Sequence, residues 1–326
     1  MCIPKNLKSA YICGLILCLG CFLSLPAQVI SGRTSRDEPA LDIQSQSVIR
    51  VSTNFVSVPI SVTDAAGRAV SNLEIGDFEI EEDGKSETIS KIAEAGQSPL
   101  QMALLFDLSG SVNSRFDFEQ QAATRFLEKV WKPGDTVSII AFSEQPITRL
   151  RSSGSLQDAL QELLQLQPTK SATAFFDTVV YGAHVLHQSA TPETRQAEIV
   201  LSDGADNRSD CTIVDALREI QRSDTIFYSI NPSGASIRLN DINLKGQEDL
   251  ASLANETGGT AFVSEQTGDL SDIFGRIATE LRAQYLLGYY SSNAHLDGKF
   301  RQIKVSIPKR PDLRIRARQG YYAIPK

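Results

Sequence analysis

Three oxygen-bearing side chains follow the apolar run "ALLF" at every second position: Asp107, Ser109 and Ser111. Side chains at alternate positions of an extended chain face the same side, and Gly110 between the serines lets the backbone turn without a Cβ clash. One carboxylate and two hydroxyls are hard oxygen donors, which suit Mg²⁺, Mn²⁺ or Ca²⁺ better than zinc. The stretch therefore predicts either part of a metal site or, as is common for Ser and Asp after a strand, a turn or a helix N-cap.

Two further segments place oxygen donors at comparable positions. Asp203 follows the apolar run "AEIV", and Thr173 precedes an expected helix that begins near Phe175. Taken singly, Asp203-Gly204 is a tight-turn signal and Thr173 is an N-cap signal. In an open parallel sheet, however, ligands bind beyond the carboxyl ends of the strands. Three such segments at one end of one sheet favour a divalent-cation site with the candidate ligands Asp107, Ser109, Ser111, Thr173 and Asp203.

The segment after Pro99 alternates short apolar runs with amphipathic stretches, which is typical of an α/β fold. Strands are expected over residues 102–106, 136–142, 198–201, 225–230 and 260–263. Helices are expected over residues 116–130, 156–164, 175–187, 212–221, 249–256 and 270–282. Continuous apolar strands of this kind are buried on both faces. The predicted fold class is therefore α/β, with a doubly wound, mostly parallel sheet that carries helices on both faces.

Both flanks of this segment have β-strand patterns without helices. Residues 56–62 alternate apolar with other side chains, and Asp83-Gly84 is a hairpin signal. Pro59 cannot donate to a ladder, so its strand is expected at a sheet edge or with the prolyl nitrogen facing out. We predict that the β segments 48–98 and 284–326 pair into one small β-sandwich, with the α/β domain, residues 99–283, inserted between them.

The first 27 residues have the pattern of a secretory signal peptide. Lys5 and Lys8 precede an apolar run that ends before Pro26-Ala27, and this run is short for a membrane span. We expect cleavage after Ala27 and export to the periplasm, the cell envelope or the medium. An uncleaved anchor and lipid attachment at Cys21 are the alternatives. Residues 28–47 are polar and aperiodic, which indicates a linker.

The composition limits the classes of partner. The chain has 326 residues, of which 41% are hydrophobic and 22% charged, the balance of a globular protein with two domains plus tails. Its formal net charge is −7, which makes nucleic acids and anionic membrane surfaces poor partners. We therefore expect no nucleic-acid partner and no membrane contact beyond a lipid anchor at Cys21.

The three motif segments together resemble the metal-ion-dependent adhesion site of the von Willebrand factor type A domain. Asp107-x-Ser109-x-Ser111, Thr173 and Asp203-Gly204 stand in the order of that motif, and the resemblance covers residues 100–283. The flanking β segments are similar to those of the VWFA-related domain family of exported bacterial proteins. One departure is Ser171-Ala172 before Thr173, where the family pattern has a glycine pair.

The resemblance implies a non-enzymatic module that binds a partner protein through a divalent cation. In the family, the serines and the threonine contact the metal directly, the aspartates do so directly or through water, and an acidic group of the partner completes the shell. Mg²⁺ is the expected ion, with Mn²⁺ or Ca²⁺ as alternatives. Two carboxylates nearly neutralise such a cation, and its open position then attracts a carboxylate. No catalytic residue is expected.

Two other functions stay open as alternatives. The first is a scaffold module of an envelope assembly, in which the metal only stabilises the fold. The second is a haloacid dehalogenase-type phosphatase, which also has an aspartate after its first strand. That chemistry needs a second aspartate two residues later as general acid, whereas this chain has Ser109, which cannot take that role near neutral pH. A serine hydrolase is disfavoured because "LSGSV" lacks the glycine of a nucleophile elbow.

Overall fold

The computed structural model describes residues 54–94, 98–109, 116–191, 194–232, 241–264 and 269–324. The predicted signal peptide and linker lie outside these ranges, and so do Cys21 and Ser111. Within the described ranges, no helix is both long enough and apolar enough to cross a membrane.

A six-stranded sheet forms the centre of the α/β part, with the strand order β10-β9-β8-β5-β6-β7. The strands are β5 (Leu100–Asp107), β6 (Thr136–Phe142), β7 (Pro146–Ser153), β8 (Arg195–Leu201), β9 (Thr225–Asn231) and β10 (Ala261–Val263). Neighbouring strands are parallel except at one edge, where β7 runs antiparallel to β6. Every residue of β5 is buried, as expected for a central strand with helices on both of its faces.

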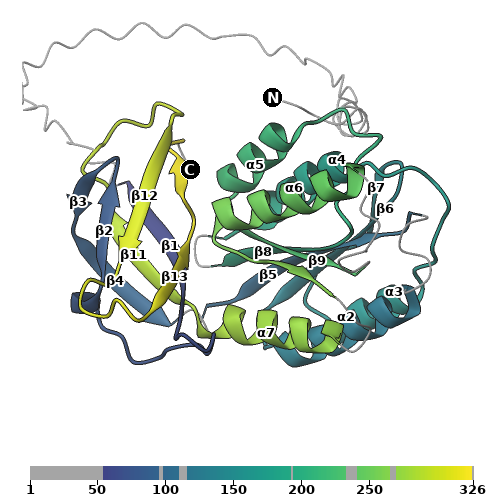
Figure 1. The fold of residues 1–326 in the computed structure, drawn as a ribbon, viewed down its shortest axis with the longest axis horizontal. Coiled ribbons are helices and arrows are strands. Elements are labelled where there is room, and N and C mark those ends of the chain that lie inside the picture. Colours follow the sequence, from purple (N-terminus) through teal and green to yellow (C-terminus); the bar gives the residue numbers. More distant parts are fainter. Residues whose placement is uncertain are drawn as a thin grey trace, which may run out of the picture. The chain divides into compact units, whose positions relative to one another are not determined.

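Helices cover both faces of this sheet (Figure 1). One face carries α2 (Phe116–Val130), α3 (Leu156–Leu164) and α7 (Asp269–Ala283), and the other carries α4 (Phe175–Ser189), α5 (Ile213–Arg222) and α6 (Asp241–Thr257). Alternate residues of β5 point to opposite faces of the sheet. Leu104 packs in the core with α2 and α7, whereas Leu105 packs in the core with α4. The predicted α/β fold class, with its doubly wound and mostly parallel sheet, is confirmed.

Two elements differ from the sequence-based expectation. The helix expected over residues 249–256 is only the second half of α6, which begins at Asp241. The edge strand β7 was not expected, because its sequence begins with proline and places arginines among its apolar residues. Only one face of β7 packs on the α/β core, so it lacks the continuous apolar run of the inner strands.

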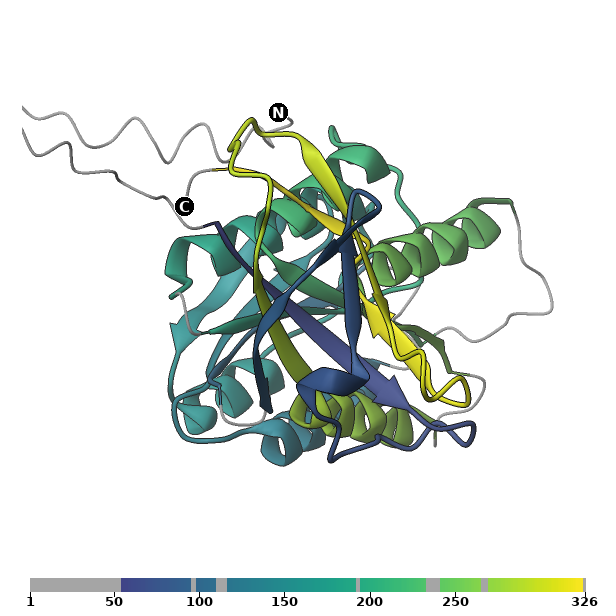
Figure 2. The ribbon, with the colours of Figure 1, turned by 90° about the vertical axis from the view of Figure 1, so that its left-hand side faces the viewer.

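The flanking segments form two four-stranded sheets, with the orders β13-β1-β11-β4 and β14-β12-β2-β3. Their elements are β1 (Phe55–Thr63), a 3₁₀ turn η1 (Ile75–Asp77), β2 (Glu79–Glu82), β3 (Lys85–Glu87), β4 (Ile89–Glu94), β11 (Tyr285–Tyr290), β12 (Phe300–Ser306), β13 (Arg314–Ala317) and β14 (Gly320–Tyr322). Each sheet combines strands from both ends of the chain (Figure 2). Side chains of the two sheets share one hydrophobic core, to which Val58, Ile80, Leu287 and Ile303 contribute. The predicted pairing of the two β segments is therefore confirmed.

Two local expectations about these strands have different outcomes. Asp83 and Gly84 have φ values of 48° and 77° and join β2 to β3, as a two-residue hairpin turn requires. For Pro59, the edge-strand alternative is wrong, because β1 pairs with β11 on one side and with β13 on the other, whereas the alternative of an outward-facing prolyl nitrogen stays a prediction. The β13 pairing covers only Ile60 to Thr63, so Pro59 lies just outside that ladder.

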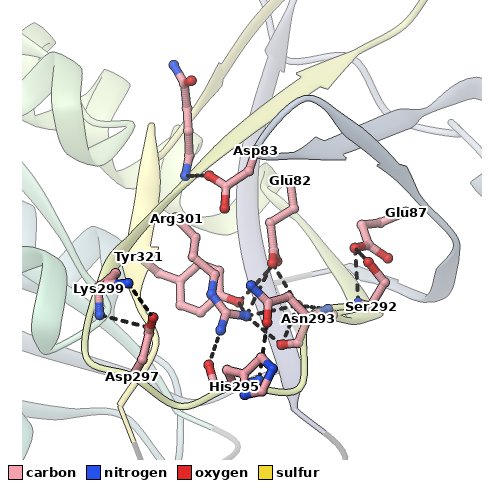
Figure 3. Close-up of polar contacts among 12 residues, drawn as sticks. Glu82, Asp83, Glu87, Ser292, Asn293, His295, Asp297, Lys299, Arg301 and Tyr321 are labelled. Atoms are coloured by element: carbon pink, nitrogen blue, oxygen red, sulfur yellow. Dashed lines mark hydrogen bonds and ion pairs between the residues drawn. The ribbon is translucent and has the colours of Figure 1, made fainter.

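A buried ion pair links the two β segments (Figure 3). Glu82 of β2 and Arg301 of β12 are 3% and 2% exposed, and Arg301 donates to Glu82 Oε1 at 3.3 Å. Glu82 also accepts hydrogen bonds from the Tyr289, Tyr321 and Ser291 hydroxyls at 2.7, 3.0 and 2.7 Å. Because the charges are paired and the carboxylate is fully hydrogen-bonded, this polar group is tolerated inside the core.

Candidate metal site

Asp107 is the last residue of β5, and its carboxylate is completely buried. Asp107 Oδ1 accepts a hydrogen bond from the Ser109 backbone N–H at 2.8 Å, which forms a tight turn directly after the strand. Asp107 Oδ2 accepts from the Ser202 hydroxyl at 2.7 Å, across the neighbouring strand end. The polar end of this apolar strand is therefore fixed by the loops that follow β5 and β8.

The pKa of Asp107 is raised to about 6, mainly because burial disfavours the charged form, with a smaller contribution from the nearby charge of Asp203. Hydrogen bonds from Ser109 and Ser202 oppose this shift. A buried carboxylate beside a second carboxylate is electrostatically unfavourable without a positive charge close to both. A bound cation would supply that charge and favour the ionised form of Asp107.

Thr173 lies in the irregular stretch before α4 and is 4% exposed. Its hydroxyl makes no hydrogen bond to any residue in the described part of the chain. The stretch that carries it is held at both sides: the Thr169 N–H donates to the Leu108 carbonyl at 2.6 Å, and the Ala174 N–H donates to the Ser143 carbonyl at 2.7 Å. The Thr173 hydroxyl is thus an available oxygen donor on a well-supported backbone.

Asp203 follows β8 and is 5% exposed. Asp203 Oδ1 accepts from the Ala205 N–H at 3.1 Å, another tight turn after a strand. The next residue, Gly204, has a φ of 78°, and a Cβ at this position would lie 2.5 Å from the Gly246 carbonyl oxygen of α6. Glycine is therefore required at position 204 both by the backbone conformation and by the close packing of α6.

Strand order explains how residues distant in sequence come to one edge of the sheet. Strands β5 and β8 are parallel neighbours with Phe106 opposite Leu201, so the loops that carry Asp107 and Asp203 begin side by side. Thr173 is attached to the second of these loops through Asn207. The structure thus places Asp107, Ser109, Thr173 and Asp203 in the loops at the carboxyl edge, while Ser111 lies outside the described residues. Their joint role as metal ligands stays a prediction.

The chemistry of these donors fits a hard cation. The described candidates offer two carboxylates and two hydroxyls, the oxygen ligands that Mg²⁺, Mn²⁺ and Ca²⁺ accept. The described ranges, this edge of the sheet included, contain no group of three or more His, Cys, Asp or Glu side chains arranged to hold a metal, so the candidate site relies on hydroxyl ligands beside its two carboxylates. The buried carboxylate of Asp107 and the unbonded Thr173 hydroxyl are the two observations that favour an ion at this edge.

Several residues that shape the site were not predicted from the sequence. They are Ser202, Asp206, Asn207 and Ser209, which hydrogen-bond to Asp107, to Thr173 or to the start of α4. All of them lie in or next to the segment "LSDGADNRSD", whose density of Ser, Asp and Asn exceeds what one tight turn needs. That density was the available signal, since these side chains commonly hydrogen-bond backbone groups in loops.

Residues 102–205 match a family model described as "von Willebrand factor type A domain". No curated protein matches the sequence. Among solved structures, BatB from Bacteroides thetaiotaomicron is 16% identical with a TM-score of 0.41, and the match covers 56% of this chain and 98% of that chain.

Two further solved structures are similar over a smaller share of their own length. A von Willebrand factor type A protein from Catenulispora acidiphila is 14% identical with a TM-score of 0.46, covering 71% of this chain and 50% of that one. Proximal thread matrix protein 1 from the mussel byssus, described "with zinc occupied MIDAS motif", is 15% identical with a TM-score of 0.47, covering 62% and 50%. This chain thus spans about half the length of these two proteins. The resemblance predicted from the motif is confirmed over residues 102–205, which match the von Willebrand factor type A domain.

Proposed function

We propose that this chain is an exported, non-enzymatic module that binds a partner protein through a divalent cation. Asp107, Ser109, Ser111, Thr173 and Asp203 hold the ion in this proposal. Mg²⁺ is the expected ion, with Mn²⁺ or Ca²⁺ as alternatives. The observation that carries the proposal is the fully buried Asp107 carboxylate beside Asp203, at the strand end where α/β sheets bind ligands.

The charge balance of the site explains what it would bind. Two carboxylates nearly cancel the charge of a divalent cation, and hydroxyl ligands add none. Because the hydroxyl ligands add no further negative charge, the ion stays electrophilic at any coordination position that the protein leaves open. A carboxylate of a partner protein is the ligand that such a position attracts. Because this chemistry holds a ligand without breaking a bond, no catalytic residue is needed.

Cation binding is tested by titrating Mg²⁺ and Mn²⁺ into the full chain in a calorimeter. The wild-type protein is expected to bind one ion, whereas Asp107→Ala loses binding because the central carboxylate is gone. Asp107→Asn keeps the size of the side chain and its acceptor for the Ser109 N–H, which separates loss of charge from loss of the fold. Asp297→Ala, at an exposed position, is the matched control. Unchanged cation affinity in Asp107→Asn and Asp107→Ala would refute the assignment.

Partner binding is tested with envelope extract, using the full chain as bait in Mg²⁺ or in a chelator. The proposal expects a protein that is retained in Mg²⁺, released by chelator and absent from the Asp107→Asn bait. A large fall in melting temperature on chelation, with no such protein, would instead favour a scaffold whose metal stabilises the fold.

The domain division and the localisation belong to the same proposal. The pairing of β1 with β11 and of β2 with β12 supports an α/β domain over 99–283 inserted between the β segments 48–98 and 284–326. The apolar segment before Pro26-Ala27 supports export. Proteolysis that separated 48–98 cleanly from 284–326 as independent folded pieces would contradict the division, and a mature protein that retains residues 1–27 would contradict cleavage after Ala27.

A further inference from the structure

We propose that Asn207 is a positioning residue that fixes Thr173 as a ligand of the cation. This inference rests on the proposed metal-binding function and assigns part of that site to a residue outside the predicted ligand set. It also implies that one loop, residues 202–211, sets two ligands of the site: Asp203 directly and Thr173 through Asn207.

A two-point contact joins Asn207 to the backbone of Thr173. The Thr173 N–H donates to Asn207 Oδ1 at 2.9 Å, and the Asn207 N–H donates to the Thr173 carbonyl at 3.1 Å. Both backbone polar groups of the candidate ligand are thus satisfied by one residue of the neighbouring loop. A contact of this kind fixes the position and the orientation of the Thr173 backbone, from which the side-chain hydroxyl projects.

The same loop also caps the helix that begins next to Thr173. The N-cap residue of α4, Ala174, has no side chain that could cap it. Instead, the Phe175 N–H donates to Asp206 Oδ1 at 2.9 Å, and the Asp177 N–H donates to Ser209 Oγ at 3.0 Å. The Ser209 hydroxyl in turn donates to Asp206 Oδ1 at 2.6 Å.

The capping is reciprocal, because Asp177 of α4 returns hydrogen bonds to the loop. Its two carboxylate oxygens accept from the Cys211 N–H at 2.9 Å and the Asp210 N–H at 3.2 Å. The loop after β8 and the start of α4 therefore hold each other in one relative position.

These hydrogen bonds compensate for the departure of the sequence from the family pattern before Thr173. Ser171-Ala172 stands where a glycine pair is expected, and residues 166–174 have no helix or strand that would hold Thr173 in place. A metal ligand has to be held within about 0.5 Å of its productive position. Beside the flanking backbone hydrogen bonds of Thr169 and Ala174, the contacts from Asn207 restrain Thr173 itself. Residues that orient a metal ligand typically change affinity by about 10-fold to 100-fold when removed.

The test uses Mn²⁺ alone as the probe and the full chain as the protein. Asn207→Ala is expected to weaken Mn²⁺ binding about tenfold or more. It should also speed hydrogen exchange at the Thr173 amide, which loses its acceptor. Asn207→Asp keeps an Oδ1 acceptor for the Thr173 N–H, and both variants keep the backbone N–H that donates to Thr173, so Asn207→Asp should bind Mn²⁺ more tightly than Asn207→Ala. Thr173→Ala shows what loss of the ligand itself costs.

Asp215→Ala is the control for a purely structural effect. Asp215 closes the capping box of α5 with Thr212, so its loss lowers stability without touching the loop that carries Asn207. The inference is overturned if Asn207→Ala binds Mn²⁺ like wild type while Thr173→Ala does not. It is equally overturned if Asn207→Asp binds Mn²⁺ as weakly as Asn207→Ala. The same holds if Asp215→Ala loses as much Mn²⁺ affinity, for each unit of lost stability, as Asn207→Ala does. Absence of Mn²⁺ binding by the wild-type protein would instead refute the proposed function.

Discussion

Glu198 carries a carboxylate in the middle of β8, and neither of its oxygens has a hydrogen-bond partner among the residues that the structure describes. The side chain is fully buried, and Ala103 of β5 and Phe227 of β9 lie opposite it in the sheet. Gly182 of α4 makes room for it, because a Cβ on that glycine would lie 2.9 Å from Glu198 Oε1. Burial raises the pKa of Glu198 well above its ordinary value of 4.5.

This shift makes the stability of the fold depend on pH in a defined direction. Above the ordinary pKa, the unfolded chain releases the proton, whereas the folded chain keeps it because the charged form is poorly solvated. Stability is therefore fully present at low pH and falls as pH rises, by about 1.4 kcal/mol per pH unit, until the folded carboxyl ionises. If it stays protonated, the loss between pH 5 and pH 7 amounts to about 3 kcal/mol.

Glu198→Gln removes the titration and keeps the size of the side chain. Its free energy of unfolding, relative to wild type, should rise by about 1.4 kcal/mol for each pH unit above 5. The assay is guanidinium unfolding of the full chain at pH 5, 6, 7 and 8, followed by the fluorescence of Trp131, the single tryptophan. Contributions from Asp107 are common to both proteins and cancel in the difference.

The control is Glu128→Gln, which removes one carboxylate from an exposed position of α2. It gives the background effect of losing a surface charge on the same pH series. A difference between Glu198→Gln and wild type that stays constant from pH 5 to pH 8 would show that Glu198 does not hold its proton in the folded state, and the reasoning would fail.

Two further changes test the packing of the site loop and of the β-sandwich. Gly204→Ala should lower the free energy of unfolding by about 2 kcal/mol or more, because it combines an unfavourable φ with a backbone clash. Gly67→Ala, with a similar φ of 77° in open space, is its control in chemical denaturation, and equal losses would contradict a role for α6 packing. Arg301→Met leaves Glu82 buried without its cation and should cost about 3–5 kcal/mol. Adding Glu82→Gln should recover most of that loss in the same assay, and no recovery would show that buried charge is not the cause.

The fold was largely predictable because its inner strands must be apolar on both faces. The run "MALLF" before Asp107 is an example, and its continuous burial is what the structure shows. The edge strand β7 escaped prediction because edges tolerate proline and arginine. The first half of α6 escaped because Gly246 interrupts its helical pattern, and that glycine is needed for the close approach of Gly204.

The candidate ligands Asp107, Thr173 and Asp203 could be proposed from the sequence because each stands next to the end of a strand or the start of a helix. The residues that support them could not, since their contacts join distant parts of the sequence. Ser202 and Asp107 are 95 positions apart, and Asn207 and Thr173 are 34 apart. No local propensity encodes such pairs, and they become visible only when the strand order brings the loops together. The unpaired Glu198 was equally hidden, because one glutamate in an apolar run reveals nothing about its partners.

The register of the outer sheet has a mechanical consequence. Glu94 at the end of β4 and Tyr285 at the start of β11 are Cα partners, so the α/β part leaves and re-enters the β-sandwich at one place. Strands from the two ends of the chain pair directly, β1 with β11 and with β13. Tension applied between the N-terminal and the C-terminal β segment would therefore be carried by the hydrogen bonds of β1 with β11 and with β13.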